Sequence, residues 1–396
     1  MRETILIFLL LSASGAFASD FMQMTPVGAQ CIPVSFELSG NREAADQLEF
    51  DIDFSGILET VSRDEGYAHA RLVLTGRSGS WSLAADVDGD QGEMLLKKQY
   101  SGSSWETLIH MFADDLVYLL SGEQGIASTR VAYITRSNGV YSLVAATLDR
   151  RAPQTVISDD EVITTPAWSP DGAFMAFTSY RNGPGDLFLY SFENSSASRI
   201  VTGGVNTAPA WAPGSRFLAF TRSIDGNSDI CRYDRISSNV QQLTARGSIE
   251  TSASFSPTGQ QIILTSDRVG YPQLYIMDAT GGTAERAGFA HGYCDSPSWS
   301  PTGDRIAYCA RSGSNFHIFI MNSDGTEVRQ VTSGGTLNED PVWSPTGRHL
   351  AFSSDIDGIR SIYLLELNKL TLHRLSTGSE SYCAAWSPVS IQGGTQ

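Results

Sequence analysis

PAWSPDG, residues 166–172, has close relatives at nearly constant spacing through the rest of the chain. The copies are PAWAP (209–213), ASFSP (253–257), PSWSP (297–301), PVWSP (341–345) and AAWSP (384–388). Their aromatic anchors, separated by 43, 44, 44, 44 and 43 residues, are Trp168, Trp211, Phe255, Trp299, Trp343 and Trp386. A repeat of this length with four short strands per unit predicts the blades of a β-propeller.

Each repeat continues with a turn and a series of apolar runs. In Ser-Pro-Asp/Thr-Gly, proline sets φ at the second turn position and glycine accepts a positive φ at the fourth, so the chain reverses into a hairpin. After Trp168, residues 174–179, 187–192 and 198–202 then read as the second, third and fourth strands of a blade.

The last repeat lacks these later strands, because only a few residues follow Trp386. The missing strands have counterparts before the first repeat, at residues 131–135, 141–148 and 154–158. We therefore expect six blades, with the strand at Trp386 pairing beside the strand at Val131. This pairing closes the ring and protects its sheet edges.

The first 18 residues resemble a secretory signal. Arg2 precedes an apolar run at residues 5–11 and the small-residue site Ala16-Phe17-Ala18, after which we expect cleavage. The run is too short to span a bilayer stably. We expect an exported, soluble chain without a membrane span.

Residues 19–125 show a different periodicity and predict a small α/β domain that precedes a propeller over residues 126–396. Strands are expected at 32–37, 71–76, 81–88 and 94–100, and helices at 43–53 and from Ser103 to Ser121. Ser103 and Glu106 form a predicted capping box, and Gly122 ends the second helix. Residues 19–30 carry few structural signals, and we expect them to be mobile until a partner binds.

The composition points away from nucleic acid and from catalysis. A formal net charge of -16 opposes binding to a phosphate backbone and favours a cationic partner. The six histidines show no ligand spacing, and no hydrolase elbow, phosphate-binding loop or dinucleotide fingerprint is present. Five cysteines leave at least one unpaired, and buried thiols are favoured over a disulfide framework. The sequence predicts no enzyme, cofactor or metal site.

Taken together, the order of these segments resembles the TolB family of the Tol-Pal envelope system. The resemblance rests on a signal peptide, a small α/β domain, LLSGE at 119–123, STRVAY at 128–133 and the Trp-Ser-Pro repeats. TSDR at 265–268 and GYPQLY at 270–275 also match the family pattern. The resemblance implies a monomeric, periplasmic, non-enzymatic interaction hub that supports outer-membrane integrity and cell division.

The resemblance also implies two partners. A Pal-like peptidoglycan-associated lipoprotein would bind the propeller mouth, and a TolA-like protein would bind the segment after cleavage: Ser19, Asp20, Phe21, Met22 and Gln23. This segment differs from the β-branched, charged stretch usual in the family. An alternative function is a propeller that gates or assists an extracellular hydrolase or peptidase.

The loops that lead from each fourth strand into the next first strand share one face of a propeller. Five of the six loops carry acids: Glu161, Glu250, Asp295, Glu339 with Asp340, and Glu380. Such a rim could be a merely solvated surface or an anionic mouth that captures a cationic or hydrogen-bonding partner. The predicted Pal-like site comprises Asn206, Thr207, Glu250, Thr251, Asp295, Glu339 and Asp340.

Overall fold

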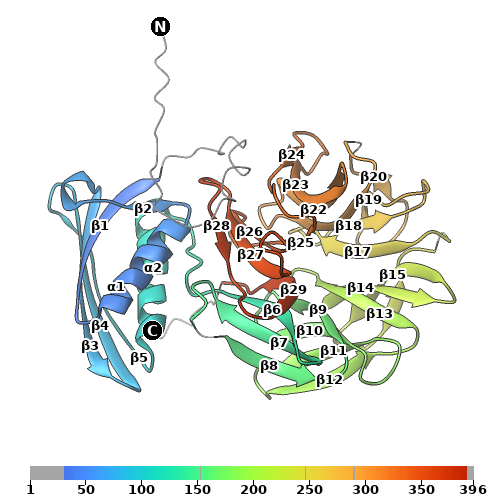
Figure 1. The fold of residues 1–396 in the computed structure, drawn as a ribbon, viewed down its shortest axis with the longest axis horizontal. Coiled ribbons are helices and arrows are strands. Elements are labelled where there is room, and N and C mark those ends of the chain that lie inside the picture. Colours follow the sequence, from blue (N-terminus) through green and yellow to red (C-terminus); the bar gives the residue numbers. More distant parts are fainter. Residues whose placement is uncertain (1–30, 152, 246, 289, 390–396) are drawn as a thin grey trace, which may run out of the picture.

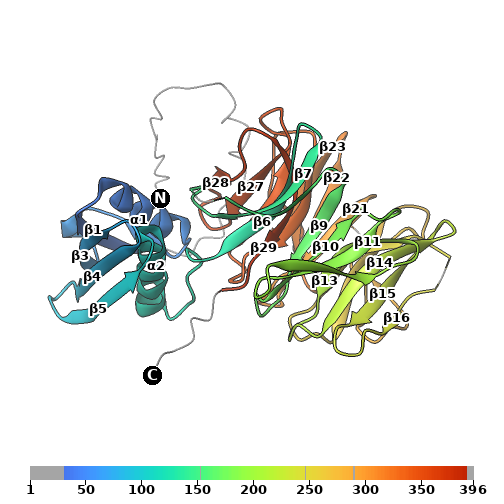
Figure 2. The same ribbon diagram turned by 90° about the horizontal axis from the view of Figure 1, so that it is seen from below.

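The computed structural model describes residues 31–151, 153–245, 247–288 and 290–389. An α/β region stands beside a six-bladed β-propeller, with its two helices between its own sheet and the propeller (Figures 1 and 2). The fold class predicted from the repeats is thus confirmed. Ser19 to Gln23 lie outside the described residues.

The α/β region contains one five-stranded sheet in the order β2-β1-β3-β4-β5. Its elements are β1 (Ile32–Ser39), α1 (Arg42–Phe54), β2 (Leu58–Thr60), the 3-10 turn η1 (Arg63–Glu65), β3 (Ala68–Arg77), β4 (Ser80–Gly89), β5 (Met94–Gly102) and α2 (Trp105–Ser121). β1 runs parallel to β2 and β3, whereas β3, β4 and β5 form an antiparallel meander.

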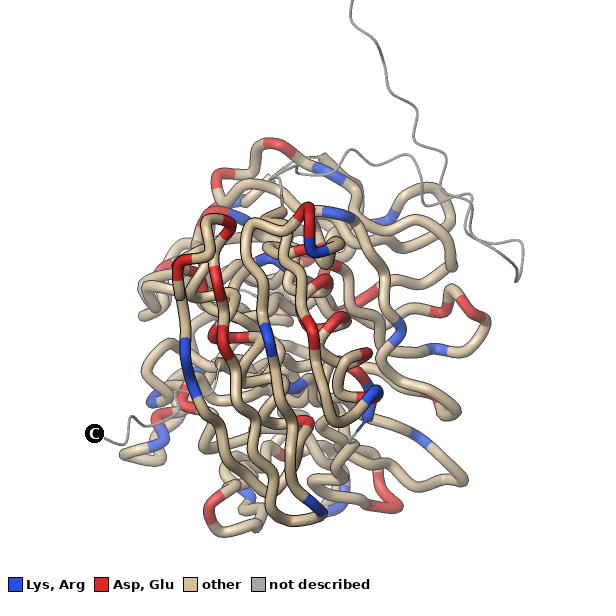
Figure 3. Tube along the Cα trace, turned by 90° about the vertical axis from the view of Figure 1, so that its left-hand side faces the viewer, with Lys and Arg blue, Asp and Glu red and all other residues tan. Residues whose placement is uncertain are grey.

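One face of this sheet is covered by the helices and the other is open. Leu48, Leu72, Leu83 and Phe112 belong to the core between sheet and helices. Figure 3 shows acidic and basic residues interspersed along the strands of the sheet. Arg71 and Asp88 form an ion pair at 2.7 Å. This alternation is expected of a sheet with one solvated face.

The start of α2 differs from the prediction by one residue. Ser104, and not Ser103, is the N-cap: its Oγ accepts a hydrogen bond from the Thr107 backbone N–H at 3.3 Å. The predicted end is confirmed, because Gly122 caps the helix in the left-handed region with φ of 73°.

Each blade is a four-stranded antiparallel sheet. Blade 1 comprises β9 (Ile163–Trp168), β10 (Phe174–Ser179), β11 (Asp186–Ser191) and β12 (Ser196–Val201). Blade 2 comprises β13 (Val205–Trp211), β14 (Phe217–Ile224), β15 (Asn227–Asp234) and β16 (Val240–Gln242). Blade 3 comprises β17 (Glu250–Phe255), β18 (Gln261–Ser266), β19 (Gln273–Asp278) and β20 (Glu285–Arg286).

Blade 4 comprises β21 (Cys294–Trp299), β22 (Arg305–Ser312), β23 (Asn315–Asn322) and β24 (Arg329–Gln330). Blade 5 comprises β25 (Asn338–Trp343), β26 (His349–Ser354), β27 (Ser361–Glu366) and β28 (Leu372–Arg374). Blade 6 joins β29 (Glu380–Trp386) to β6 (Arg130–Ser137), β7 (Val140–Thr147) and β8 (Gln154–Asp159).

Blade 6 combines the two ends of the propeller, because β29 pairs antiparallel with β6 and places Trp386 opposite Val131. This is the closing pair that the sequence predicts. Trp386 is 8% exposed, and its Nε1–H donates to Thr129 Oγ1 at 2.9 Å. The ring is therefore closed by strand pairing and by a buried indole.

The α/β region packs on the hairpin side of blade 5. The ring of Phe54, at the end of α1, lies 4.8 Å from that of His349, and His349 Nε2 is 2.6 Å from the Phe54 carbonyl oxygen. Asn368 Nδ2 donates to the Gly56 carbonyl at 2.8 Å. This side is opposite the predicted mouth, so the mouth is not covered by the α/β region.

All five cysteines are free thiols. Cys231, Cys294 and Cys309 are buried in blade strands, as the sequence favours, while Cys31 and Cys383 are half-buried. No helix in the described ranges is both long and apolar enough to cross a membrane.

Candidate functional site

The predicted mouth residues all lie near the start of an innermost strand, in β13, β17, β21 or β25. They do not form one ring, because they occupy three successive positions before the aromatic anchor. Asn206 and Glu250 lie five residues before it, Asp340 lies three before it, and Thr207, Thr251, Asp295 and Glu339 lie four before it. Side chains alternate along a strand, so these positions face different surroundings.

Asn206 and Glu250, both part of the predicted Pal-like site, are fully buried in this structure. Asn206 Nδ2 donates to the carbonyls of Gly185 and Gly203, each at 3.3 Å, and its Oδ1 accepts from Arg222 Nε at 3.0 Å. These bonds tie the entry loop to the loop between β10 and β11, which belongs to the preceding blade. Asn206 therefore holds the loops of the mouth in place through buried hydrogen bonds.

Glu250 has the same place in blade 3 but carries a charge. Its Oε1 accepts from Arg268 at 3.2 Å and from Ser266 Oγ at 3.1 Å. A buried carboxylate needs such partners, because burial of an unpaired charge is costly. Sequence reasoning missed Arg268 as this partner, although Arg268 lies in the loop that faces the same mouth.

Asp295, Glu339 and Asp340 come together on the walls of blades 4 and 5. Glu339 Oε2 lies 2.5 Å from a guanidinium nitrogen of Arg360, and Asp340 Oδ2 lies 4.0 Å from the same nitrogen. Asp340 Oδ1 accepts from Ser296 Oγ at 3.0 Å. Glu339 and Asp340 thus share one cation, and Asp295 lies close enough to both for their charges to interact. Arg360 is a further residue that the sequence did not single out.

Burial raises the pKa of Asp295 and of Glu339, and the neighbouring Asp340 raises both further. The rise reflects carboxylates that are partly withdrawn from water and face like charge. Asp295 is also held by hydrogen bonds from Thr265 Oγ1 at 2.9 Å and the Ser296 N–H at 2.7 Å. The acids that converge are therefore those of two adjacent blades.

The remaining acids of the predicted rim stand apart from this group. Glu161 and Glu380 are exposed, and Glu380 lies 4.0 Å from Arg136 of its own blade. Thr207 and Thr251 are half-buried at the positions equivalent to Asp295 and Glu339. The mouth is consequently acidic on one side and hydroxyl-lined on the other.

One residue in each innermost strand has a positive φ, although none of the six is glycine. We call these residues, three before each anchor, the left-handed ring: Thr165, Ala208, Ser252, Ser296, Asp340 and Cys383. Their φ values lie between 47° and 55°, and each coincides with a register shift against the second strand. Such bulges redirect a side chain and often border functional sites.

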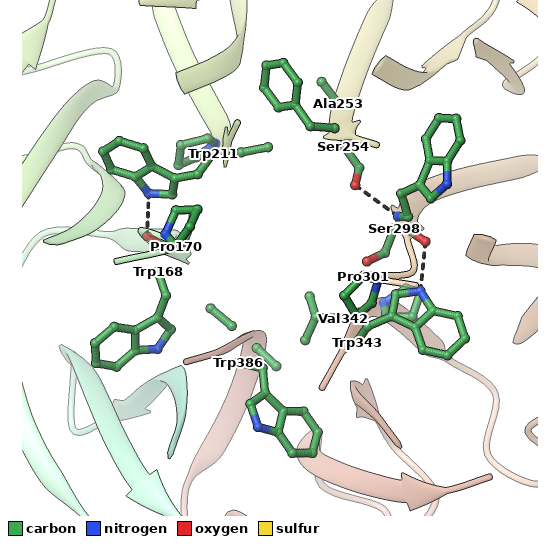
Figure 4. A pocket seen from close by; sticks show the side chains of 18 of the residues that line it. Trp168, Pro170, Trp211, Ala253, Ser254, Ser298, Pro301, Val342, Trp343 and Trp386 are labelled. Atoms are coloured by element: carbon green, nitrogen blue, oxygen red, sulfur yellow. Dashed lines mark hydrogen bonds between the residues drawn. The ribbon is translucent and has the colours of Figure 1, made fainter. Parts of the chain in front are cut away.

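Beyond the left-handed ring, the channel widens into a cavity of about 590 Å³ that extends to the Ser-Pro turns. Figure 4 shows the anchors Trp168, Trp211, Trp343 and Trp386 arranged around it. The indoles of Trp211 and Trp343 donate to carbonyl oxygens of the preceding blade, Ala167 at 3.1 Å and Ser298 at 2.9 Å. Trp211 and Trp343 therefore join adjacent blades, and they also line the channel.

Within the described residues, no group of three His, Cys, Asp or Glu side chains could hold a metal ion. The channel instead offers hydroxyls, carboxylates and apolar rings from successive blades. A closed ring of six four-stranded sheets with these groups along its axis is a six-bladed β-propeller.

The family described as "TolB beta propeller domain" matches residues 117–390. The chain therefore belongs to the TolB β-propeller family, as the order of its segments predicts.

Curated relatives support this placement. The Tol-Pal system protein TolB of Bordetella pertussis is 38% identical over 189 residues, covering 47% of this chain and 43% of that protein. The Tol-Pal system protein TolB of Legionella pneumophila is 30% identical over 236 residues, covering 52% of this chain and 55% of that protein. The chain thus spans about half the length of the curated relatives it matches.

The likeness in structure extends over more of the chain. TolB from Acinetobacter baumannii superposes with a TM-score of 0.82 at 23% sequence identity, covering 92% of this chain and 98% of that one. At this identity the likeness concerns the fold, and it includes the α/β region as well as the propeller.

Proposed function

We propose that this chain is a non-enzymatic interaction hub of a Tol-Pal envelope system, exported to the periplasm by a cleaved signal at residues 1–18. It docks a Pal-like lipoprotein at the propeller mouth and supports outer-membrane integrity and cell division. The carrying observation is the acidic group of the mouth, in which Glu339 and Asp340 share the guanidinium of Arg360 and Asp295 lies beside them. The names of the curated relatives support a role in the Tol-Pal system.

In this proposal the mouth residues have two roles. Thr207, Thr251, Asp295, Glu339 and Asp340 contact the partner, because their side chains are not fully buried. Asn206 and Glu250 hold the entry loops in place through buried hydrogen bonds. An acidic group whose negative charge exceeds that of its neighbouring cations attracts a partner surface with basic or hydrogen-bond-donating groups.

The proposal assigns the TolA-like partner to Ser19, Asp20, Phe21, Met22 and Gln23 at the start of the mature chain. This assignment rests on the resemblance to the TolB family. The two partners would then bind separate parts of one monomeric chain, which is what a hub requires.

Site-directed photo-crosslinking tests the proposal. A photoreactive residue at Thr251, in the mouth, should crosslink to a purified Pal-like lipoprotein domain and not to a TolA-like domain. The same residue at Thr326, an exposed position in the β23–β24 hairpin on the opposite face, should give no product with the Pal-like domain. Equal products from both positions, or none from Thr251, would refute docking at the mouth.

A further inference from the structure

The cavity on the Ser-Pro side of the channel has a different lining from the predicted mouth, apart from one shared residue. Its lining begins at the left-handed ring and ends at the prolines of the Ser-Pro turns, so it opens on the other face of the propeller. Of the seven predicted mouth residues, the described lining contains Asp340 alone. A partner at the mouth would leave the Ser-Pro opening accessible.

The cavity has the size and surface of a small-molecule site. Its volume of about 590 Å³ falls within the range of about 300–1,000 Å³ that is typical of ligand pockets. Prolines, alanines and aromatic anchors supply most of the wall, and Trp168, Trp211 and Trp299 remain half-buried there. Such a wall favours the apolar body of a ligand.

The charge of the cavity is negative and is concentrated at one residue. Asp340 is the one Asp, Glu, Lys or Arg among the described lining residues. Burial raises the pKa of the lining thiol Cys383 to about 12, so Cys383 is neutral at pH 7. Asp295 and Glu339 lie next to Asp340. The guanidinium of Arg360 also pairs with Glu339, whose Oε2 is 2.5 Å from an Arg360 nitrogen. The floor is therefore negative and the wall uncharged.

We propose that this cavity binds a small organic cation that has an apolar body and one primary ammonium group. The ammonium lies at Asp340, whose Oδ1 accepts from Ser296 Oγ at 3.0 Å and whose Oδ2 lies 3.8 Å from the Cys383 sulfur and 4.0 Å from Arg360. The apolar body lies among the prolines and indoles, whose faces also attract a cation. A single carboxylate in an apolar wall suits an ammonium better than a metal ion, which requires several oxygen ligands.

This inference goes beyond the proposed function, because it concerns the opposite opening and does not depend on a Pal-like partner. Asp340 is the point where the two meet, since it lines the cavity and borders the mouth. Occupation of the cavity would thus place a positive charge beside the acidic group of the mouth.

Calorimetric titration of the full mature chain with n-hexylammonium chloride tests the site. The titration is run in about 0.15 M salt, where the Debye length is ~8 Å and general attraction to an acidic protein is largely screened. We expect saturable binding of one equivalent. Hexanol, which has the same chain without the charge, should bind at least about tenfold more weakly.

Matched variants separate the cavity from the general charge of the protein. Asp340→Asn keeps the shape of the side chain and should weaken hexylammonium binding by about tenfold or more. Asp324→Asn removes the same charge at an exposed turn and should change the affinity by less than about twofold. Ala210→Phe should abolish binding by filling the cavity, with folding verified by the melting temperature of each variant.

Three results would overturn the proposal. The first is absence of saturable binding by a folded wild-type chain. The second is equal affinity for hexylammonium and hexanol, which would make the cavity an apolar site only. The third is equal loss in Asp340→Asn and Asp324→Asn, which would reduce the binding to an adventitious surface attraction. None of these results bears on crosslinking at Thr251, so the two proposals fail separately.

Discussion

Asn206 and Asn338 occupy the same place in blades 2 and 5, five residues before the anchor, and both are buried. Asn338 Nδ2 donates to the carbonyls of Phe316 at 3.0 Å and Gly334 at 3.1 Å, while its Oδ1 accepts from Ser354 Oγ at 2.8 Å. The two amides thus perform the same task of tying neighbouring loops at the mouth.

Replacing either amide should destabilise the fold. We expect Asn206→Ala and Asn338→Ala each to lower the free energy of unfolding by about 1–3 kcal/mol, because buried carbonyls lose their donors. Asn194→Ala, at an exposed turn, should change it by less than about 0.5 kcal/mol. Urea denaturation measures the difference. Equal midpoints for all three variants would contradict the positioning role.

His349 makes stability depend on pH at the contact with the α/β region. Complete burial lowers its pKa from 6.5 to about 4, and its Nε2 meets the Phe54 carbonyl. Because the unfolded chain takes up this proton and the folded chain does not, stability is complete above about pH 6.5 and is lost as the pH falls toward 4. The loss from this one group is at most about 3 kcal/mol.

His349→Gln should flatten this dependence, since glutamine can still donate to the Phe54 carbonyl but does not titrate. The difference in unfolding free energy between pH 7 and pH 4.5 should therefore be smaller in the variant than in the wild-type chain. Urea titrations at both pH values measure it. Identical pH dependence in the two proteins would show that His349 does not set it.

At the residue scale, the sequence shows which side chains each strand carries better than it shows which way those side chains face. Position in the repeat places Glu250 and Asp295 near the start of an innermost strand, and both lie there. Whether Glu250 is buried depends on how the bulge in its strand shifts the alternation of side chains. The bulge residues, such as Ser252 in this strand and Ala208 in blade 2, are not glycine. No local glycine therefore marks the bulge. The sequence signal for the bulge is a small or polar residue three positions before each anchor.

At the scale of elements, the Ser-Pro turns and the strands between them follow from local chemistry. In the first repeat Gly172 takes φ of 70°, and its N–H donates to the Ser169 carbonyl at 2.8 Å. Residues 174–179 form β10 as predicted. The inter-blade partners of the indoles were not predictable, because these bonds join segments about one repeat apart that meet only in the folded ring.

The closing strand provides a test at this scale. Trp386→Ala should lower the free energy of unfolding by about 3–5 kcal/mol, because the indole is buried and bonded to Thr129. Trp168→Ala should cost less, since Trp168 is half-buried and its Nε1 has no partner among the described residues. Deletion from Ala384 onward should destabilise blade 6 more than either substitution. Equal midpoints for the truncated and complete chains would contradict closure by β29.

For the whole molecule, the contact between the α/β region and blade 5 should couple their unfolding. Phe54 is 6% exposed and packs on Phe50, with ring centroids 5.3 Å apart, and on His349. Phe54→Ala should weaken this contact by about 3–5 kcal/mol. Differential scanning calorimetry should then show one transition for the wild-type chain and two for the variant. Two transitions in both proteins would mean that the contact does not couple them.

The mouth residues Asp295 and Glu339 give the most direct test of the interaction hub. Calorimetry with a purified Pal-like lipoprotein domain should show that Asp295→Asn combined with Glu339→Gln weakens binding by more than about tenfold, because these carboxylates are partly withdrawn from water. The matched pair Asp171→Asn with Asp324→Asn, on the Ser-Pro side, should change the affinity by less than about twofold. Equal losses for both pairs, or no loss for the mouth pair, would contradict the account.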